Sequence, residues 1–166
     1  VYKRQIERPT CIRRNVAVAQ AIFEGEIQIE DIRALRCENI EEIKRAFKDN
    51  LIAVTVDPEG KYIKELKPLC VIDGILAKKN LGTNKDMAPI TIGLGPGFEA
   101  GNDVDLVIET NRGHDLGRLI FKGPAAANTG NPGNINGFTT ERILRSPASG
   151  KVHIIKDLGS VVKKGD

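Results

Sequence analysis

Residues 39–57, with the sequence NIEEIKRAFKDNLIAVTVD, decide the fold class of this chain. Asn39 precedes Glu42 by three residues, which is the spacing of a capping box, and we predict a helix from there to about Asn50. Its predicted buried stripe is Ile40, Ile43 and Phe47. The apolar, β-branched run at 51–56 predicts a buried strand. A helix followed directly by a buried strand is typical of α/β proteins.

The segment before this helix predicts a further helix and a pair of strands. Thr10 can cap a helix over 11–24, and Gly25 can end it. The apolar positions of that helix are Ile12, Val16, Ala19 and Phe23. Apolar and polar residues alternate on both sides of Glu30 and Asp31, which predicts two short strands joined by a turn.

The segment after it predicts a β-rich part. Residues 69–72 predict a short buried strand that delivers Asp73 at its carboxyl end, where open parallel sheets commonly bind ligands. Three further strands, at 90–92, 106–108 and 119–121, are separated by Gly-rich loops too short for crossover helices. We therefore predict an antiparallel or mixed sheet after Gly74. Residues 123–137 predict a long surface loop, and 140–145 a last strand.

Composition favours a folded protein and argues against several classes of function. A hydrophobic content of 40% supports a core. The 25 Lys and Arg nearly balance 22 Asp and Glu, without a basic block or many aromatics, so nucleic acid is not an expected partner. The three Cys lack metal-ligand spacing, and we predict neither a disulfide framework nor a metal site. No run predicts a signal peptide or a membrane span, which favours the cytoplasm.

Both ends lead us to expect a fragment. The only Met is Met87, so the chain as given has no initiator. Residues 1–5, VYKRQ, resemble the translation of a sequencing-library adapter, and we exclude them from the predicted fold. Residues 146–166, which include Asp157, Leu158 and Gly159, stop in mid-pattern.

A glycine-rich turn and a charged loop carry candidate chemistry. Residues 95–100, GPGFEA, satisfy the G-x-G-x-x-G/A pattern through Gly95 and Gly97, and they follow a strand. No helix of the required length follows, and Pro96 removes one N–H donor. We favour a tight strand connection over phosphate binding by this turn alone.

The charged loop at 109–118, ETNRGHDLGR, gathers two guanidinium groups, two carboxylates, one imidazole and two glycines. Arg112 and Arg118 can bind carboxylate or phosphate, and His114 beside Asp115 can transfer a proton. A solvated hairpin with a few salt bridges is the alternative. A second polar cluster close after Asp73 favours a functional role, and its members are Lys78, Lys79, Asn80 and Asp86.

Three strings, in this order, resemble the accessory protein family of the selenium-dependent molybdenum hydroxylase system, the YqeB-like proteins. They are 71–83 (VIDGILAKKNLGT), 88–89 with 93–98 (AP and GLGPGF), and 109–118. The resemblance covers residues 6–166. It implies a bacterial, cytoplasmic protein that assists the maturation of selenium-containing molybdenum hydroxylases, which are partner enzymes of the xanthine dehydrogenase kind. It implies no catalytic residue, and whether the chain is an enzyme stays open.

The resemblance also implies a domain order. Residues 6–73 would form a Rossmann-like α/β part whose first strand and Gly-rich turn lie upstream. Ile6 and Glu7 would then end the second strand, and Glu7 could accept hydrogen bonds from a ribose. Residues 74–145 would form the β-rich part with the main motifs. Residues 146–166 look similar to the first half of a biotinyl/lipoyl-like barrel, without a carrier lysine.

We predict a polar site for an anionic cofactor or intermediate, either the molybdenum cofactor, which carries a phosphate, or a nucleotide. The binding candidates are Glu7, Asp73, Lys78, Lys79, Asn80, Gly95, Gly97, Asn111, Arg112, Gly113 and Arg118. The candidates for proton transfer are His114, Asp115 and Asp73. Two alternatives stay open, an oxidoreductase that uses a nicotinamide nucleotide bound by Glu7 and the upstream turn, and a carrier or protein-interaction module centred on the C-terminal barrel.

Overall fold

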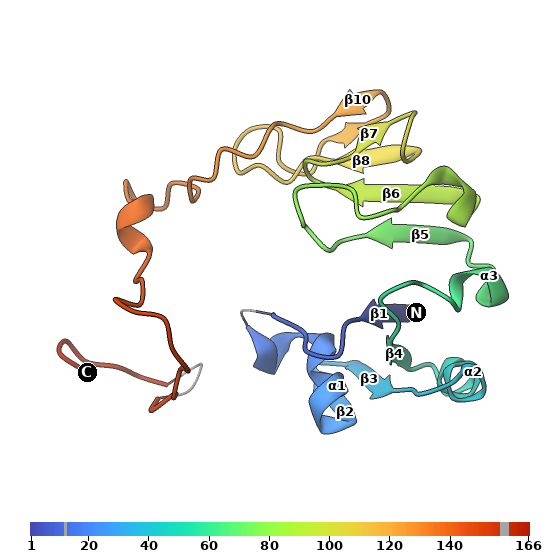
Figure 1. The fold of residues 1–166 in the computed structure, drawn as a ribbon, viewed down its shortest axis with the longest axis horizontal. Helices are drawn as coiled ribbons and strands as arrows, with labels where there is room; N and C mark the ends of the chain where they lie inside the picture. The colour runs from blue at the N-terminus through green and yellow to red at the C-terminus, as the bar shows by residue number, and fades with distance from the viewer. Residues whose placement is uncertain (12, 157–159) are drawn as a thin grey trace. The chain divides into compact units, whose positions relative to one another are not determined.

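A computed structural model describes residues 1–11, 13–156 and 160–166 (Figure 1). The protein is a mixed α/β protein with several sheets and few helices. It divides into two compact units, Val1–Tyr62 with Gly150–Asp166 (unit 1) and Ile63–Ser149 (unit 2). The domain limits predicted at 73/74 and 145/146 stay predictions. In the part of the chain that the structure describes, no helix is long and apolar enough to cross a membrane.

Unit 1 is built on a four-stranded sheet with the order β1-β4-β3-β2. The strands are β1 (Tyr2–Gln5), β2 (Glu26–Ile29), β3 (Ile32–Arg36) and β4 (Ile52–Val56). β4 runs parallel to both β1 and β3, and β2 is antiparallel to β3. The predicted strand at 51–56 and the predicted hairpin are therefore confirmed, and Glu30 takes a left-handed φ of 53° in the hairpin turn.

Residues 2–5, which were excluded from the predicted fold, form strand β1 of this sheet. That residues 1–5 derive from an adapter stays a prediction. β1 pairs with β4 from Tyr2 opposite Ala53 to Gln5 opposite Val56. The Tyr2 hydroxyl donates a 2.5 Å hydrogen bond to the carboxylate of Asp57, which is only 2% exposed. A buried carboxylate needs such donors, and β1 supplies one of them.

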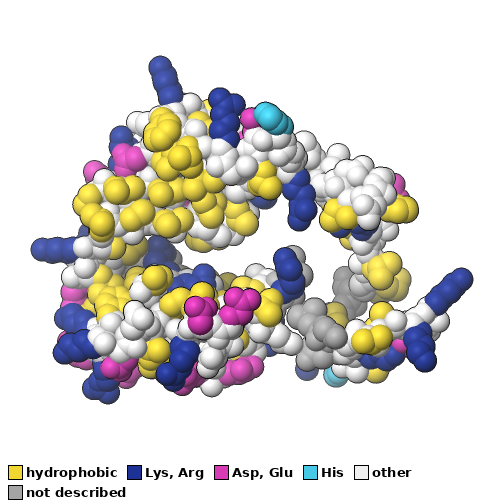
Figure 2. Space-filling view, turned by 180° about the vertical axis from the view of Figure 1, so that it is seen from behind, with side chains coloured by type: hydrophobic (Ala, Val, Ile, Leu, Met, Phe, Trp, Pro, Cys, Tyr) yellow, Lys and Arg dark blue, Asp and Glu magenta, His cyan; other side chains and the backbone are white. Residues whose placement is uncertain are grey.

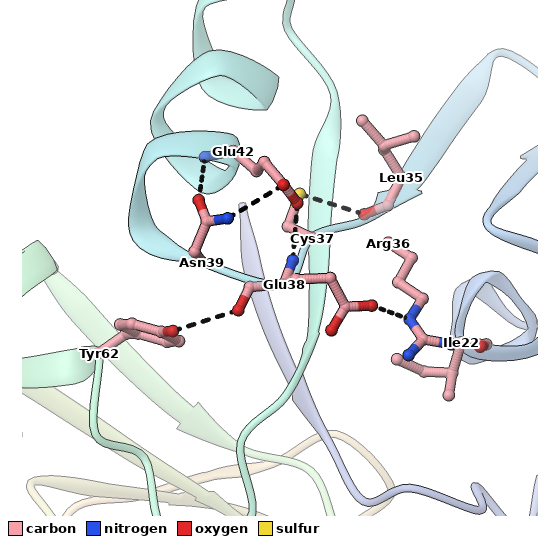
Figure 3. A network of polar contacts seen from close by, with 8 residues as sticks. All are labelled: Ile22, Leu35, Arg36, Cys37, Glu38, Asn39, Glu42 and Tyr62. Carbon is pink, nitrogen blue, oxygen red and sulfur yellow. Dashed lines mark hydrogen bonds and ion pairs between the residues drawn. The ribbon is translucent and has the colours of Figure 1, made fainter.

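Helix α2 (Ile40–Lys48) begins at the predicted capping box. The Asn39 side chain accepts a hydrogen bond from the Glu42 N–H at 3.0 Å, and the Glu42 carboxylate accepts one from the Glu38 N–H at 2.8 Å (Figure 3). Ile43 and Ala46 form the buried face. Phe47 is 38% exposed, so this position of the predicted stripe is wrong. The small side chain of Ala46, rather than that of Phe47, lies on the buried face of α2.

The helix predicted over 11–24 is interrupted. Two 3-10 turns, η1 (Arg14–Val16) and η2 (Val18–Gln20), precede the single-turn helix α1 (Ala21–Glu24). The residue before η1 is Arg13, which makes no side-chain cap, and Ala17 is extended, so the helical hydrogen bonds cannot run through. Gly25 ends α1 as predicted, with φ +85°. The predicted apolar position Ile12 lies outside the described residues.

Unit 2 holds a four-stranded sheet, β5-β6-β8-β9, and a two-stranded sheet, β10-β7. The strands are β5 (Cys70–Asp73), β6 (Ile90–Leu94), β7 (Glu99–Ala100), β8 (Leu106–Ile108), β9 (Leu119–Ile120) and β10 (Gly123–Pro124). β5, β6 and β8 run parallel, whereas β9 is antiparallel to β8. The predicted mixed sheet is confirmed. The short helix α3 (Ile63–Leu66) precedes β5, and the 3-10 turn η3 (Lys85–Met87) follows it.

Three predictions about buried or regular segments are wrong. β5 is an edge strand rather than a buried one, because β6 is its single neighbour, and Ile72 on it is 60% exposed. Residues 140–145 form no strand, since Thr140–Arg142 is a 3-10 turn (η4) and Leu144 is 98% exposed. The described residues of 146–166 contain neither helix nor strand, so no start of a barrel is seen there. The predicted pattern at Asp157, Leu158 and Gly159 lies outside the described residues.

Candidate functional site

Three loops of unit 2 meet at one edge of its sheet. They follow β5, β6 and β8, and because parallel strands end at the same edge, their loops lie where α/β sheets bind ligands. Nearly all predicted site residues lie on these loops or, in the case of Asp73, at the last position of β5. They are Asp73, Lys78, Lys79, Asn80, Gly95, Gly97, Asn111, Arg112, Gly113, His114, Asp115 and Arg118. Glu7 belongs to unit 1, where it is exposed two residues after the end of β1 rather than at the predicted end of a strand.

A groove with a volume of about 210 Å³ lies among these loops. Its positively charged lining residues are Lys78, from the loop after β5, and Arg112, from the loop after β8. Asn111 also lines it, together with residues of the loop after β10, among them Asn128, Thr129 and Asn131. The side chain of Arg112 runs along that loop, because a Cβ on Gly133 would lie 2.5 Å from its Cδ. The groove thus joins two cations with several amide and hydroxyl groups.

Two glycines of the 95–100 turn let the loops pack this closely. Gly97 has φ +111°, and a Cβ on it would lie 2.6 Å from the Cα of Lys79. Gly95 has φ +76°, and a Cβ on it would overlap the hydroxyl of Thr110. The turn connects β6 to β7 without opening a helix, which is the strand connection favoured from the sequence. Its two predicted binding glycines therefore bring backbone segments together.

The loop after β5 holds Lys78 in an unusual conformation. Leu76 and Lys78 have φ of 58° and 62°, in the left-handed region that residues with a Cβ rarely adopt. Asp73, which is 7% exposed, fixes the loop, since its carboxylate accepts hydrogen bonds from the Thr83 hydroxyl at 2.6 Å and the Ile75 N–H at 3.1 Å. Such backbone persists only where the surroundings hold it in place.

Asn80 has a similar positioning role. Its side-chain oxygen accepts hydrogen bonds from the N–H groups of Gly82 and Thr83 at 2.9 and 2.8 Å, and its amide donates to the Thr83 carbonyl. Asp73 and Asn80 thus shape the loop that carries Lys78. Lys79 is exposed and is not among the groove-lining residues.

Glu109 joins two walls of the groove, and its role was not recognised from the sequence. It is 5% exposed, and its carboxylate accepts 2.7 Å hydrogen bonds from the N–H groups of Asn111 and Ala126. Burial acts to raise the pKa of Glu109, but the backbone N–H groups of Ala126, Asn111 and Thr110 outweigh it and hold the pKa below its usual range. A carboxylate directly after an apolar strand was the available sequence signal.

The far end of the 109–118 loop is a solvated hairpin. The N–H of Gly117 donates to the Glu109 carbonyl, and the N–H of Glu109 donates to the Arg118 carbonyl. The Arg118 guanidinium lies 3.6 Å from the Asp115 carboxylate, and both side chains are mostly exposed. Asp115 therefore pairs with Arg118, and His114 is exposed. Gly113, His114 and Arg118 are not among the residues that line the groove.

Two further features of the described residues bear on the choice of site. A larger depression of about 370 Å³ in unit 1 is lined mainly by apolar residues and includes none of the predicted site residues. No group of three or more His, Cys, Asp and Glu in the described ranges could hold a metal ion.

Fold and groove together define a mixed α/β protein with a small, polar, cation-bearing groove at the carboxyl edge of parallel strands. The chain is 52% identical over 162 residues to the uncharacterized protein YqeB of Escherichia coli (strain K12). The match covers 98% of this chain and 30% of YqeB, so the chain spans about a third of the length of that relative. No family model matches the chain. No solved structure matches it either.

Proposed function

We propose that the chain is part of a bacterial, cytoplasmic accessory protein in the maturation of selenium-dependent molybdenum hydroxylases, and that the groove of unit 2 binds an anionic cofactor or intermediate. The likeness to YqeB supports the family, and the resemblance of the three strings supports the role. A hydroxylase of the xanthine dehydrogenase kind would be the partner that receives the bound group.

One observation carries the binding proposal: Lys78 and Arg112, from separate loops, line the same groove. An ammonium group and a planar guanidinium together suit a phosphate, because each makes charge-assisted hydrogen bonds and the guanidinium can bind two oxygens at once. The neighbouring Asn and Thr side chains can donate to the remaining oxygens. The phosphate of the molybdenum cofactor has the chemistry that this groove would recognise.

The binding proposal is tested by titrating purified molybdopterin, and inorganic phosphate as a simpler probe, against the protein. Arg112→Ala and Lys78→Ala should each weaken binding by about tenfold to a hundredfold, since a hydrogen bond to a charged group contributes roughly 1.5–3 kcal/mol. Lys122→Ala is the matched control. Lys122 follows β9, and because β9 is antiparallel to β8, Lys122 lies at the end of the sheet opposite to the groove. The change removes one exposed positive charge there.

Affinities that stay the same in Arg112→Ala and Lys78→Ala, or that fall equally in Lys122→Ala, would count against the groove. Arg118→Ala adds a further comparison. If Arg118→Ala lowers the affinity as much as Arg112→Ala does, the proposed site would have to include the whole 109–118 hairpin.

Unit 1 favours one alternative, an oxidoreductase that uses a nicotinamide nucleotide. β3, α2 and β4 form a parallel strand–helix–strand unit, and Glu7 is exposed two residues after the parallel strand β1. A Rossmann-like domain places an acidic residue at such a position to bind the ribose. Titration with NADH, followed by fluorescence, tests it. Binding that Glu7→Ala weakens and Arg112→Ala leaves unchanged would favour this alternative.

A further inference from the structure

One face of the four-stranded sheet of unit 2 is entirely apolar. Side chains alternate between the two faces along each strand, and the register places Ile72 opposite Ile92 and Ile92 opposite Leu106. The pair Ile108 and Leu119 continues the same face. We define the open face by its residues Cys70, Ile72, Ile90, Ile92, Leu94, Leu106, Ile108 and Leu119.

The opposite face is covered by unit 2 itself. It carries Asp73, Thr91, Gly93 and Val107, all of which are buried. Val107 packs in a core cluster with Phe98, Ala100, Val104 and Ala125.

Within unit 2, every residue of which the structure describes, the open face has no such cover. None of its eight side chains is buried, and Ile72, Ile90 and Leu119 are 60%, 44% and 52% exposed. Figure 2 shows apolar side chains gathered over the sheet of unit 2. The two faces of one sheet therefore differ in burial although both carry apolar residues.

The parallel pairing of β5, β6 and β8 explains why a covering layer is expected on the open face. Parallel sheets are normally covered on both faces, because the helices that connect their strands pack there. Among the described residues, the link from β5 to β6 contains only the 3-10 turn η3, and the link from β6 to β8 contains the short strand β7. The unit therefore lacks the helices that would form the second layer. A contiguous exposed apolar surface of this kind marks a packing or interaction site.

We propose that the open face packs against a helical layer from another part of the same polypeptide, in a chain of the relative's length. The match to YqeB covers 30% of that protein, so most of such a polypeptide lies outside the matched stretch and can supply the layer. The occupant is an amphipathic helix, or a pair of helices, whose apolar side covers Ile72, Ile90 and Leu119. The other side of each helix is polar and faces water.

Thiol labelling tests the proposal in two chains. Ile72→Cys and Leu119→Cys are made in this 166-residue chain and at the aligned positions of full-length YqeB, with Lys122→Cys as an exposed control. Labelling is followed by tandem mass spectrometry, which assigns each label to a single residue and so separates position 72 from Cys70. The native Cys11, Cys37 and Cys70 therefore need not be replaced. In the 166-residue chain we expect both test positions to react as fast as the control.

In full-length YqeB the two test positions should react at least about tenfold more slowly than the control, because reaction needs the covering layer to open. Equal rates in the full-length protein would overturn the proposal. Protection that already exists in the 166-residue chain and grows with its concentration would show a second copy on this face, and would overturn it as well.

Discussion

Glu109 shows how one residue can organise a groove without lining it. Its carboxylate holds the backbone of the hairpin after β8 and the backbone of the loop after β10, through the N–H groups of Asn111 and Ala126. Both segments carry groove-lining residues. The position of Arg112 relative to Asn128 and Asn131 therefore depends on a buried carboxylate that stays charged.

Replacing Glu109 should destabilise unit 2. Glu109→Ala leaves two N–H groups without their acceptor, and we expect a loss of about 1–3 kcal/mol in the free energy of unfolding. Urea unfolding measures this loss. Glu99→Gln, which changes an exposed carboxylate of β7, is the control and should change stability by less than about 0.5 kcal/mol. A small effect of Glu109→Ala would mean that water replaces the carboxylate.

The pH dependence follows from the lowered pKa of Glu109. Because the folded protein holds this pKa below that of the unfolded chain, its contribution to stability is fully present above the unfolded value of about 4.3 and is lost as the pH falls through the folded value. Glu109→Gln should therefore lose less stability than the wild type on acidification from about pH 6 to pH 3. Parallel curves for the two proteins would contradict this.

At the scale of elements, the groove depends on how closely loops approach one another. The turn after β6 packs its Gly97 against the backbone of Lys78 and Lys79 in the loop after β5. Strand pairing brings the loops to one edge, and glycine then allows contact between their backbones.

Gly97→Ala should push these two loops apart. Its Cβ would meet the backbone of Lys79, and it would also carry the cost of a left-handed φ, roughly 1–2 kcal/mol. Gly82→Ala is a matched control, because Gly82 has φ +114° but no atom within 4 Å of an added Cβ. We expect Gly97→Ala to lose at least about 1 kcal/mol more stability than Gly82→Ala and to weaken phosphate binding. Equal losses in the two variants would show that the loops tolerate the added methyl group.

At the scale of the whole molecule, each unit has a hydrophobic core of its own. Val54 belongs to the core of unit 1, with Ala21, Ile22 and Ala34. Val107 belongs to the core of unit 2, and both valines are fully buried.

Val107→Ala should lower the stability of unit 2 and leave unit 1 unchanged. We expect a loss of about 2 kcal/mol, from about 0.8 kcal/mol for each buried methylene and a cavity term. Hydrogen exchange should show the loss in the amides of β6 and β8, with little change in β4. Val54→Ala should give the reverse pattern. Equal loss of protection in both cores would show that the two units unfold together.

The sequence by itself determined the local structure of residues 26–57 and the class of the whole fold. The capping box of Asn39 and Glu42, the apolar strand at 51–56 and the hairpin around Glu30 each depend on contacts within a few residues or on a simple periodicity. Neighbouring residues are sufficient to specify such features. Where a segment has neither a cap nor a partner strand, as at 11–24 and 140–145, periodicity alone misled.

Only the tertiary structure decided which polar side chains share a site. Lys78 and Arg112 line one groove because β5 and β8 are both parallel to β6, and this pairing depends on contacts between distant segments. The same long-range packing buried Glu109 against the loop after β10, where its carboxylate accepts a hydrogen bond from the Ala126 N–H. A sequence lists the charges of a loop, but burial and strand register determine where each charge points.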